Sequence, residues 1–172
     1  MIRYARHLSH RGLRRTTVLV LLAAVVALVA AAPASARQSQ DIVETATAAG
    51  QFTTLTKLVK KAGLVNALKQ AGPYTVFAPT DKAFAKIPKH KLRALARDKA
   101  KLKKVLLYHV VAKKLPAAKV VKRKGAKTLN GKRVRFRVRG GDVFVNRAKV
   151  TTADVMASNG VIHVINRVLL PR

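Results

Sequence analysis

Apolar residues in the first half of the chain recur at the spacing of amphipathic helices. The clearest run predicts a helix that ends at Gly63, with Thr53 or Thr54 as its cap. Its inward positions lie three, four and seven residues apart: Leu55, Leu58, Val59 and Ala62. A short helix capped by Asp41 is expected before it, and another short helix over Leu64 to Ala71 is expected after it.

The middle of the chain predicts one buried strand followed by three helices. Tyr74 to Ala78 is apolar apart from its threonine, which is typical of a strand covered on both faces. Thr80 or Asp81 then provides a side-chain acceptor for the first N–H groups of the next helix. Further helices are expected to begin at Pro88 and at Asp98, and the second of these carries a lysine-rich outer surface.

The second half of the chain changes to the patterns of strands and tight turns. Leu129 to Val138 is expected to form a strand, and Gly140-Gly141 then supplies a hairpin turn. The returning strand is expected over Val143 to Val150, with Arg147-Ala148 as a bulge, and a final strand is expected over Val161 to Leu170. Helices come first and strands last, so the α+β class is predicted.

The first 36 residues have the composition of a secretory signal peptide. Arginines without acidic residues precede an uninterrupted apolar run of 15 residues from Val18 to Ala32. Pro33 breaks that run, and Ala34-Ser35-Ala36 is a cleavage site of the A-x-A type. The run is short for a membrane span, which needs about 20 residues, although an uncleaved anchor is the alternative. Residues 37–172 are then expected to form one domain, secreted or held at the cell envelope, with no stable membrane insertion after processing.

The charge of the chain is extreme. It holds 36 Lys and Arg against 6 Asp and Glu. Five of the arginines lie in the signal segment, so residues 37–172 keep 31 basic residues and a net charge of +25. Such a domain attracts polyanions, although a general basic bias or a solubility device is the alternative. The chain has no cysteine, which fits a bacterial envelope or medium better than an animal ectodomain.

Three apolar blocks with fixed polar inserts follow one another along the chain. They are TVFAPTDKAF at residues 75–84, Tyr108-His109 between aliphatic pairs, and NGVIHVINRVLLP at residues 159–171. Together they resemble the fasciclin domain, an extracellular adhesion and anchoring module, over about Asp41 to Pro171. The resemblance implies a small β-sandwich or wedge with helices packed against it. Asn166 stands where the family usually carries Asp, and we expect this change to loosen a buried hydrogen-bond network.

The resemblance also marks candidate recognition residues. Tyr108-His109 and Asp154-Val155 stand at the places of an integrin-adhesion motif in animal members of the family. The alternative is structural, in which His109 hydrogen-bonds a backbone or carboxylate partner inside the fold. Asp154 would then cap a turn and Val155 would fill the core. His163 on the final strand is expected to be a satisfied core histidine.

One predicted strand separates apolar and basic residues, because side chains along a strand alternate between its faces. Its apolar face carries Val134, Phe136 and Val138. Its other face carries the candidate polyanion-binding residues Arg133, Arg135, Arg137 and Arg139. Four further candidates lead into the strand: Lys122, Arg123, Lys124 and Lys127.

The arginines of this strand are expected to form a rail for a repeating polyanion. Successive arginines lie about 6.6 to 6.8 Å apart, and arginine binds phosphate or carboxylate with two hydrogen bonds. The alternative is a solvated face that protects the strand from aggregation. No aromatic residue is expected on this face, which disfavours single-stranded nucleic acid.

The sequence offers no signal for catalysis. It lacks the nucleophile elbow and the phosphate-binding loop, and its acids are scattered. Two core histidines are too few for a closed zinc site, so no metal or other cofactor is expected. The favoured function is adhesion or anchoring at the cell envelope or in an extracellular matrix. The expected partner is an anionic cell-wall polymer, an acidic polysaccharide or a cell-surface protein. The alternatives are an extracellular nucleic-acid-binding protein and a cationic protein that disrupts membranes.

The leader generates a prediction about processing. Cleavage after Ala36 should leave Arg37 as the mature N-terminus, because the cleavage signal follows the helix-breaking Pro33. N-terminal sequencing of the exported protein measures this directly. An intact Met1 or Ile2 end on envelope-bound protein would instead favour the anchor.

Overall fold

The computed structural model describes residues 40–70 and 72–171. The predicted signal peptide, residues 1–36, lies outside the described residues. Over the part of the chain that the structure describes, no helix is both long enough and apolar enough to cross a membrane.

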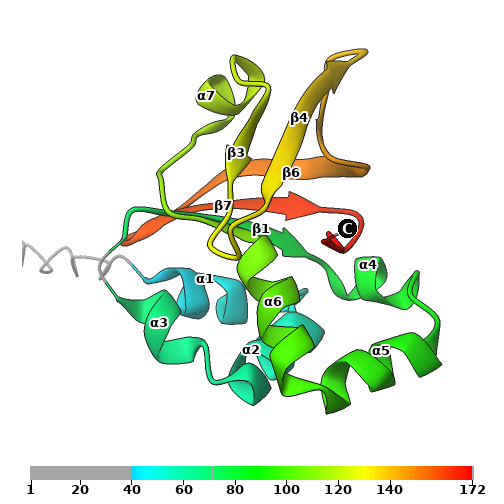
Figure 1. Ribbon diagram of the computed structural model, residues 1–172. Helices are drawn as coiled ribbons and strands as arrows, with labels where there is room; N and C mark the ends of the chain where they lie inside the picture. The colour runs from blue at the N-terminus through cyan, green and yellow to red at the C-terminus, as the bar shows by residue number, and fades with distance from the viewer. Residues whose placement is uncertain (1–39, 71, 172) are drawn as a thin grey trace, which may run out of the picture. The chain divides into compact units, whose positions relative to one another are not determined.

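Helices fill the first half of the described chain, as predicted. They are α1 (Ile42–Ala48), α2 (Thr53–Ala62), α3 (Val65–Lys69), α4 (Asp81–Ala85), α5 (Lys89–Arg97) and α6 (Lys99–Tyr108). Asp41 caps α1 and Asp98 caps α6, as the sequence predicts. A further short helix, α7 (Ala117–Val121), has no counterpart in the sequence prediction. Figure 1 shows α1, α2, α3 and α6 gathered on one side of the strands, with α5 at the edge of this layer.

The strands form one seven-stranded sheet. They are β1 (Tyr74–Pro79), β2 (Val110–Val111), β3 (Gly125–Lys127), β4 (Arg133–Arg139), β5 (Asp142–Val145), β6 (Ala148–Ala157) and β7 (Gly160–Ile165). Their order is β2-β1-β7-β6-β5-β4-β3. β1 and β7 are parallel, whereas the other neighbours are antiparallel.

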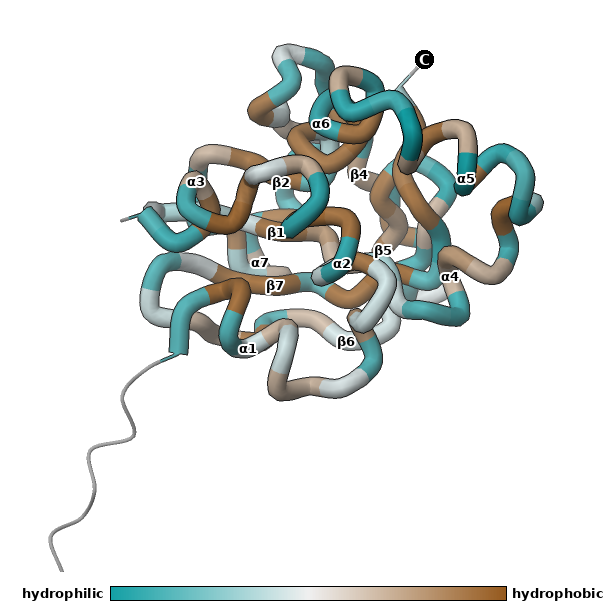
Figure 2. Tube along the Cα trace, turned by 90° about the horizontal axis from the view of Figure 1, so that it is seen from below, coloured by the Kyte–Doolittle hydropathy of each residue, from teal (hydrophilic) through white to brown (hydrophobic). Residues whose placement is uncertain are grey.

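Strands β1 and β7 lie between two hydrophobic cores. Val76 and Ile162 join the core under the helices, whereas Phe77 and Ile165 point the other way. The second core is enclosed by the bent sheet, since it also takes residues from β2, β4, β5 and β6. Figure 2 shows the hydrophobic colour running along β1 and β7. This arrangement confirms the α+β class and a wedge with helices packed against it.

The hairpin that follows β4 differs from the sequence prediction. The segment expected as one bulged strand from Val143 to Val150 is two strands, because Asn146 and Arg147 form a tight turn between β5 and β6. Asn146 supports this turn with a positive φ of 55°, a conformation that asparagine tolerates well. The expected bulge at Arg147-Ala148 is therefore wrong.

Two strand ends also differ from the prediction. β4 begins at Arg133 instead of Leu129, because Thr128 and Lys132 close a turn through backbone and side-chain hydrogen bonds. β7 ends at Ile165 instead of Leu170, because the chain leaves the sheet and Leu169 is buried in the second core.

The turn after β1 caps two helices at once. Thr80 accepts a hydrogen bond from the backbone N–H of Ala83 (3.3 Å) and so caps its own helix, α4. The Asp81 carboxylate instead reaches α2, where it accepts from the backbone N–H groups of Thr53 (3.1 Å) and Thr54 (2.7 Å). The expectation that Thr53 or Thr54 caps α2 is wrong, since the N-cap is a phenylalanine without a side-chain acceptor.

The Asp81 carboxylate is held in its ionised form. Desolvation by burial alone would raise the pKa of Asp81. The hydrogen bonds from Thr54 and Thr53 outweigh this effect and hold the pKa of Asp81 below its ordinary value. The carboxylate therefore ties the start of α2 to the end of β1.

We expect Asp81→Ala to lower the free energy of unfolding by about 1–2 kcal/mol, because two N–H groups of α2 lose their acceptor. Chemical denaturation at neutral pH measures the change. Lys82→Ala is the control at the neighbouring exposed position and should change stability by less than about 0.5 kcal/mol. Equal effects of the two substitutions would contradict the capping role.

Candidate functional site

Strand β4 presents a row of arginines to solvent. Val134 and Phe136 are buried, whereas the arginines between them are exposed, so the predicted alternation is confirmed. Val138 belongs to the apolar side but is 50% exposed near the tip of the hairpin. The arginine row consists of Arg133, Arg135, Arg137 and Arg139.

Residues of the neighbouring strands lie on the same face as the arginine row, because directly paired residues of antiparallel strands share a face. Lys127 of β3 pairs with Arg133. On β5, Phe144 pairs with Arg137 and Asp142 pairs with Arg139. Lys149 of β6 in turn pairs with Phe144. The arginine row together with Lys127, Asp142, Phe144 and Lys149 is called the basic sheet face below.

Phe144 corrects the expectation that this face lacks an aromatic residue. The correction follows from the turn, since Gly140 and Gly141 have positive φ angles of 55° and 80°. These angles belong to a two-residue hairpin turn of type I′. The turn pairs Arg139 with Asp142, so that Phe144 lies across from Arg137. Phe144 is partly buried, flanked on both sides by strands that carry cations.

The arginine row is not neutralised by carboxylates of the fold. Over residues 40–70 and 72–171, ion pairs form at Lys69, Lys101 and Lys149 but not at any arginine. The pair on the basic sheet face joins Lys149 Nζ to Asp142 at 2.6 Å. The four arginines are therefore exposed to solvent, and none has a carboxylate partner among the described residues.

Tyr108 fixes the base of the arginine row from inside the protein. Its side chain is buried, and its hydroxyl donates to the carbonyl oxygen of Arg133 (3.0 Å). The same hydroxyl accepts from Asn146 Nδ2 (3.0 Å), and Asn146 Oδ1 accepts from the backbone N–H of Arg135 (2.9 Å). Tyr108 thus positions the strand that carries the arginines, and it presents little of its own surface.

His109 is also internal, with 3% of its surface exposed. Nε2 accepts from the backbone N–H of Leu169 (2.9 Å), so Nδ1 carries the proton and donates to the carbonyl oxygen of Val105 (2.8 Å). Desolvation by burial lowers the pKa of His109 to about 4, against the opposing effect of the Val105 hydrogen bond. The expectation of an internal backbone partner is confirmed.

Asp154 lies at a register shift in β6, with a positive φ of 57°. Its backbone N–H donates to His163 Nδ1 (3.4 Å), and its carboxylate accepts from the N–H of Ala117, the first residue of α7 (2.8 Å). His163 Nε2 donates to the carbonyl oxygen of Leu115 (2.8 Å). The two side chains thus hold the segment that leads into α7, while Val155 packs against the first core.

The structure separates the four candidate adhesion residues. Tyr108 and His109 are buried on the α6 side, whereas Asp154 is exposed and Val155 is partly buried on β6. Each of the three polar side chains makes a hydrogen bond that the fold uses. A role of these four residues in recognition stays a prediction.

The remaining basic candidates lie beside β4. Lys122, Arg123 and Lys124 are exposed in the connection from α7 to β3. The carbonyl oxygen of Lys124 accepts from the backbone N–H of Phe136 (3.0 Å), so this connection lies along the strand that carries the arginines. These three basic residues therefore lie next to the strand that carries the arginine row.

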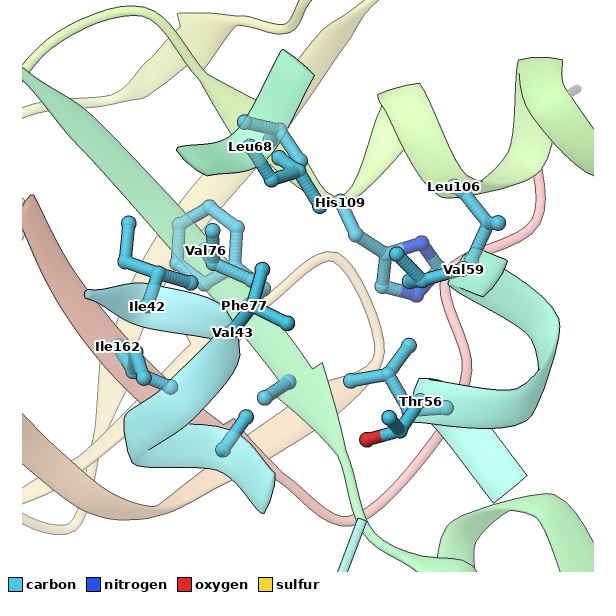
Figure 3. Close-up of a pocket in the computed structure, with 14 residues that line it drawn as sticks. Ile42, Val43, Thr56, Val59, Leu68, Val76, Phe77, Leu106, His109 and Ile162 are labelled. Carbon is cyan, nitrogen blue, oxygen red and sulfur yellow. The ribbon is translucent and has the colours of Figure 1, made fainter. Parts of the chain in front are cut away.

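A second feature with free space is an apolar hollow between α1, α2, α6 and β1 (Figure 3). Its free volume is about 40 Å³, which is room for only a few atoms. Its polar residues are Thr56 and His109, and both ring nitrogens of His109 already bind backbone groups. The hollow is a small packing space of the first core rather than a binding site.

Comparison with known proteins adds a family assignment to this geometry. The family model for the fasciclin domain matches residues 50–171. Protein sll1483 of Synechocystis sp. is 48% identical over 140 residues, which cover 80% of this chain and 77% of that protein. Immunogenic protein MPB70 of Mycobacterium bovis is 36% identical over 146 residues, which cover 81% of this chain and 74% of that protein.

Longer relatives and a solved structure share the same region. The transforming growth factor-beta-induced protein ig-h3 of Sus scrofa is 36% identical over 121 residues, covering 70% of this chain but only 18% of that protein. A solved FAS1 domain pair from the insect cell adhesion molecule fasciclin I superimposes with a TM-score of 0.60 at 22% identity. The match covers 71% of this chain and 46% of that chain and shows a shared fold.

The burial of His109 generates a prediction about acid stability. The unfolded pKa is near 6.5 and the folded pKa is about 4, so the unfolded state binds the proton first. The stability that the neutral ring contributes is complete above pH 6.5 and is lost as the pH falls through 4. The loss should be on the order of 3 kcal/mol, measured by urea denaturation across this range.

His109→Phe is the variant that isolates this effect. It should be less stable at pH 7 by about 1–3 kcal/mol, because Val105 and Leu169 keep unpaired backbone groups. The difference from the wild type should shrink as the pH falls from 6.5 to 4. A difference that stays constant over this range would show that the buried ring does not titrate with the fold.

Proposed function

The chain belongs to the fasciclin family, and on this premise we propose that it is a secreted, non-enzymatic adhesion and anchoring module that holds anionic polymers on its basic sheet face. The insect protein that shares its fold is a cell adhesion molecule. The proposed partners are an anionic cell-wall polymer or an acidic polysaccharide at the cell envelope or in an extracellular matrix.

The use of the acidic residues carries this proposal. All six acids of the chain lie among the described residues, and each has a task in the fold. Five of them serve helix starts: Asp41, Glu44, Asp81, Asp98 and Asp154. The sixth, Asp142, pairs with Lys149. Asp142 thus neutralises one lysine of the basic sheet face, and none of the six acids pairs with an arginine of the row. The surface potential therefore favours a polyanionic partner over one of mixed charge.

The arginine row is the part of this surface that is best organised for binding. The hydrogen bonds of Tyr108 and Asn146 hold the backbone of Arg133 and Arg135, so the first half of the row sits on a fixed support. Each guanidinium presents a planar fork that matches phosphate or carboxylate. Binding then releases the counterions of the polymer, which makes affinity depend on salt.

Replacement of all four arginines of the row by glutamine tests the proposal. The variant should bind inorganic polyphosphate more weakly, because four guanidinium groups are lost while polar length is kept. The slope of log affinity against log salt should become shallower by about 2–4, since close to one counterion is released for each phosphate contact. Titration of the purified mature domain at several salt concentrations measures both quantities.

The matched control removes equal charge from exposed helix positions. It replaces Lys89, Lys91, Lys99 and Lys103 by glutamine. The control should keep most of the affinity for polyphosphate and most of the retention on isolated cell envelopes. Equal losses in the two quadruple variants would show that net charge alone is responsible and that the row is not a site.

A further inference from the structure

We infer that the basic sheet face binds single-stranded nucleic acid, with Phe144 as a stacking platform for a base and the arginine row as the contact to the phosphates. The inference rests on the proposed polyanion binding and adds single-stranded nucleic acid to the polymers proposed above. Its new element is Phe144, the aromatic side chain that the register places among the cations.

The surroundings of Phe144 carry the first step. Its side chain lies on the outer face of the sheet, between Arg137 on one neighbouring strand and Lys149, which is ion-paired with Asp142, on the other. Phe144 is only partly buried, so the residue keeps some surface in contact with solvent. A positively charged surface that tracks a backbone, combined with an aromatic ring for a base, is the arrangement by which proteins hold single strands.

The choice of basic residue carries the second step. Lysine is the more frequent basic residue of the domain, yet every basic residue of β4 is arginine. A face that needed only solubility would be served as well by lysine. The guanidinium group differs because it binds phosphate with a planar fork and also stacks on bases. Arg137 and Phe144, which are directly paired, thus place two stacking groups side by side.

The shape of the face selects an unpaired strand. The bases of a duplex are stacked on one another, so their flat faces are not available to a side chain on an open sheet. An acidic polysaccharide carries the charge but offers no base to stack on Phe144. A single strand satisfies both the arginine row and the ring.

The test compares two ligands with the same backbone. The mature domain is titrated with fluorescent oligothymidylate of about 20 nucleotides, longer than the roughly 4–16 nucleotides that one such module covers, and with an abasic oligomer of equal length. Phe144→Leu should weaken oligothymidylate binding by about 5- to 100-fold, in line with the loss of one stacked base. Binding of the abasic oligomer should change by less than twofold, and the salt dependence should be unchanged.

Two further variants sharpen the comparison. Val138→Ala removes a half-exposed apolar side chain from the opposite side of the same hairpin and should leave oligothymidylate binding unchanged. Phe144→Trp keeps an aromatic ring and introduces the sole indole of the chain, which has no tryptophan. Its fluorescence should be quenched by oligothymidylate and not by the abasic oligomer. This readout decides the matter even if Phe144→Leu fails to fold.

The opposing outcomes are distinct. Equal weakening of both oligomers by Phe144→Leu, or an indole signal that responds to both alike, would overturn the stacking role. If Phe144→Leu weakened binding of a polyuronate more than binding of oligothymidylate, the inference would be overturned in favour of an acidic polysaccharide. Failure of the wild type to bind polyphosphate, polyuronate and both oligomers would overturn the proposed polyanion binding itself.

Discussion

The parallel pairing of β1 with β7 is the constraint on which the rest of the structure depends. The two strands lie far apart in sequence, and both are buried on both faces. The pairing is close, since a Cβ on Gly160 would collide with the carbonyl oxygen of Tyr74. The helices cover one side of this pair and the bent sheet covers the other. Two cores therefore share one layer of backbone, and neither can form without the pair.

Where the chain leaves a buried strand pair of this kind, backbone N–H and carbonyl groups lose their partners in the sheet. The two buried histidines form hydrogen bonds with one such group each. His109 accepts a hydrogen bond from the backbone N–H of Leu169, which follows the end of β7. His163 donates a hydrogen bond to the carbonyl oxygen of Leu115, just before α7 begins. Asp154 holds the same segment by accepting a hydrogen bond from the N–H of Ala117. The polar inserts of the three apolar blocks therefore serve the fold in this chain. Tyr108 extends the same support to β4, which links the buried centre to the exposed arginines.

Local chemistry explains which features the sequence could predict. Asp41 and Asp98 act within a few residues of their own helices, so their caps are visible in the sequence. Asp81 acts on α2 from the far end of β1, and only the folded chain brings these parts together. The outward position of Phe144 follows from the two-residue turn at Gly140-Gly141, which pairs Arg139 with Asp142 and Arg137 with Phe144. The sequence alone does not show this position clearly, because Phe144 lies between two valines and β5 has no alternation of apolar and polar residues there. The short α7 has too few residues to produce a periodic signal.

The register of the sheet also explains how the domain tolerates a row of like charges. Arg135 pairs with Gly125, Arg137 with Phe144 and Arg139 with Asp142. Among the strand pairings that the structure describes, a like charge lies directly across only from Arg133, at Lys127. Repulsion between strands is thereby reduced, since like charges directly opposite destabilise a sheet. Repulsion along β4 remains, and the polyanion proposed above would reduce it. The arginines therefore form a single row along one strand, which supports the proposal of a linear polymer as the partner.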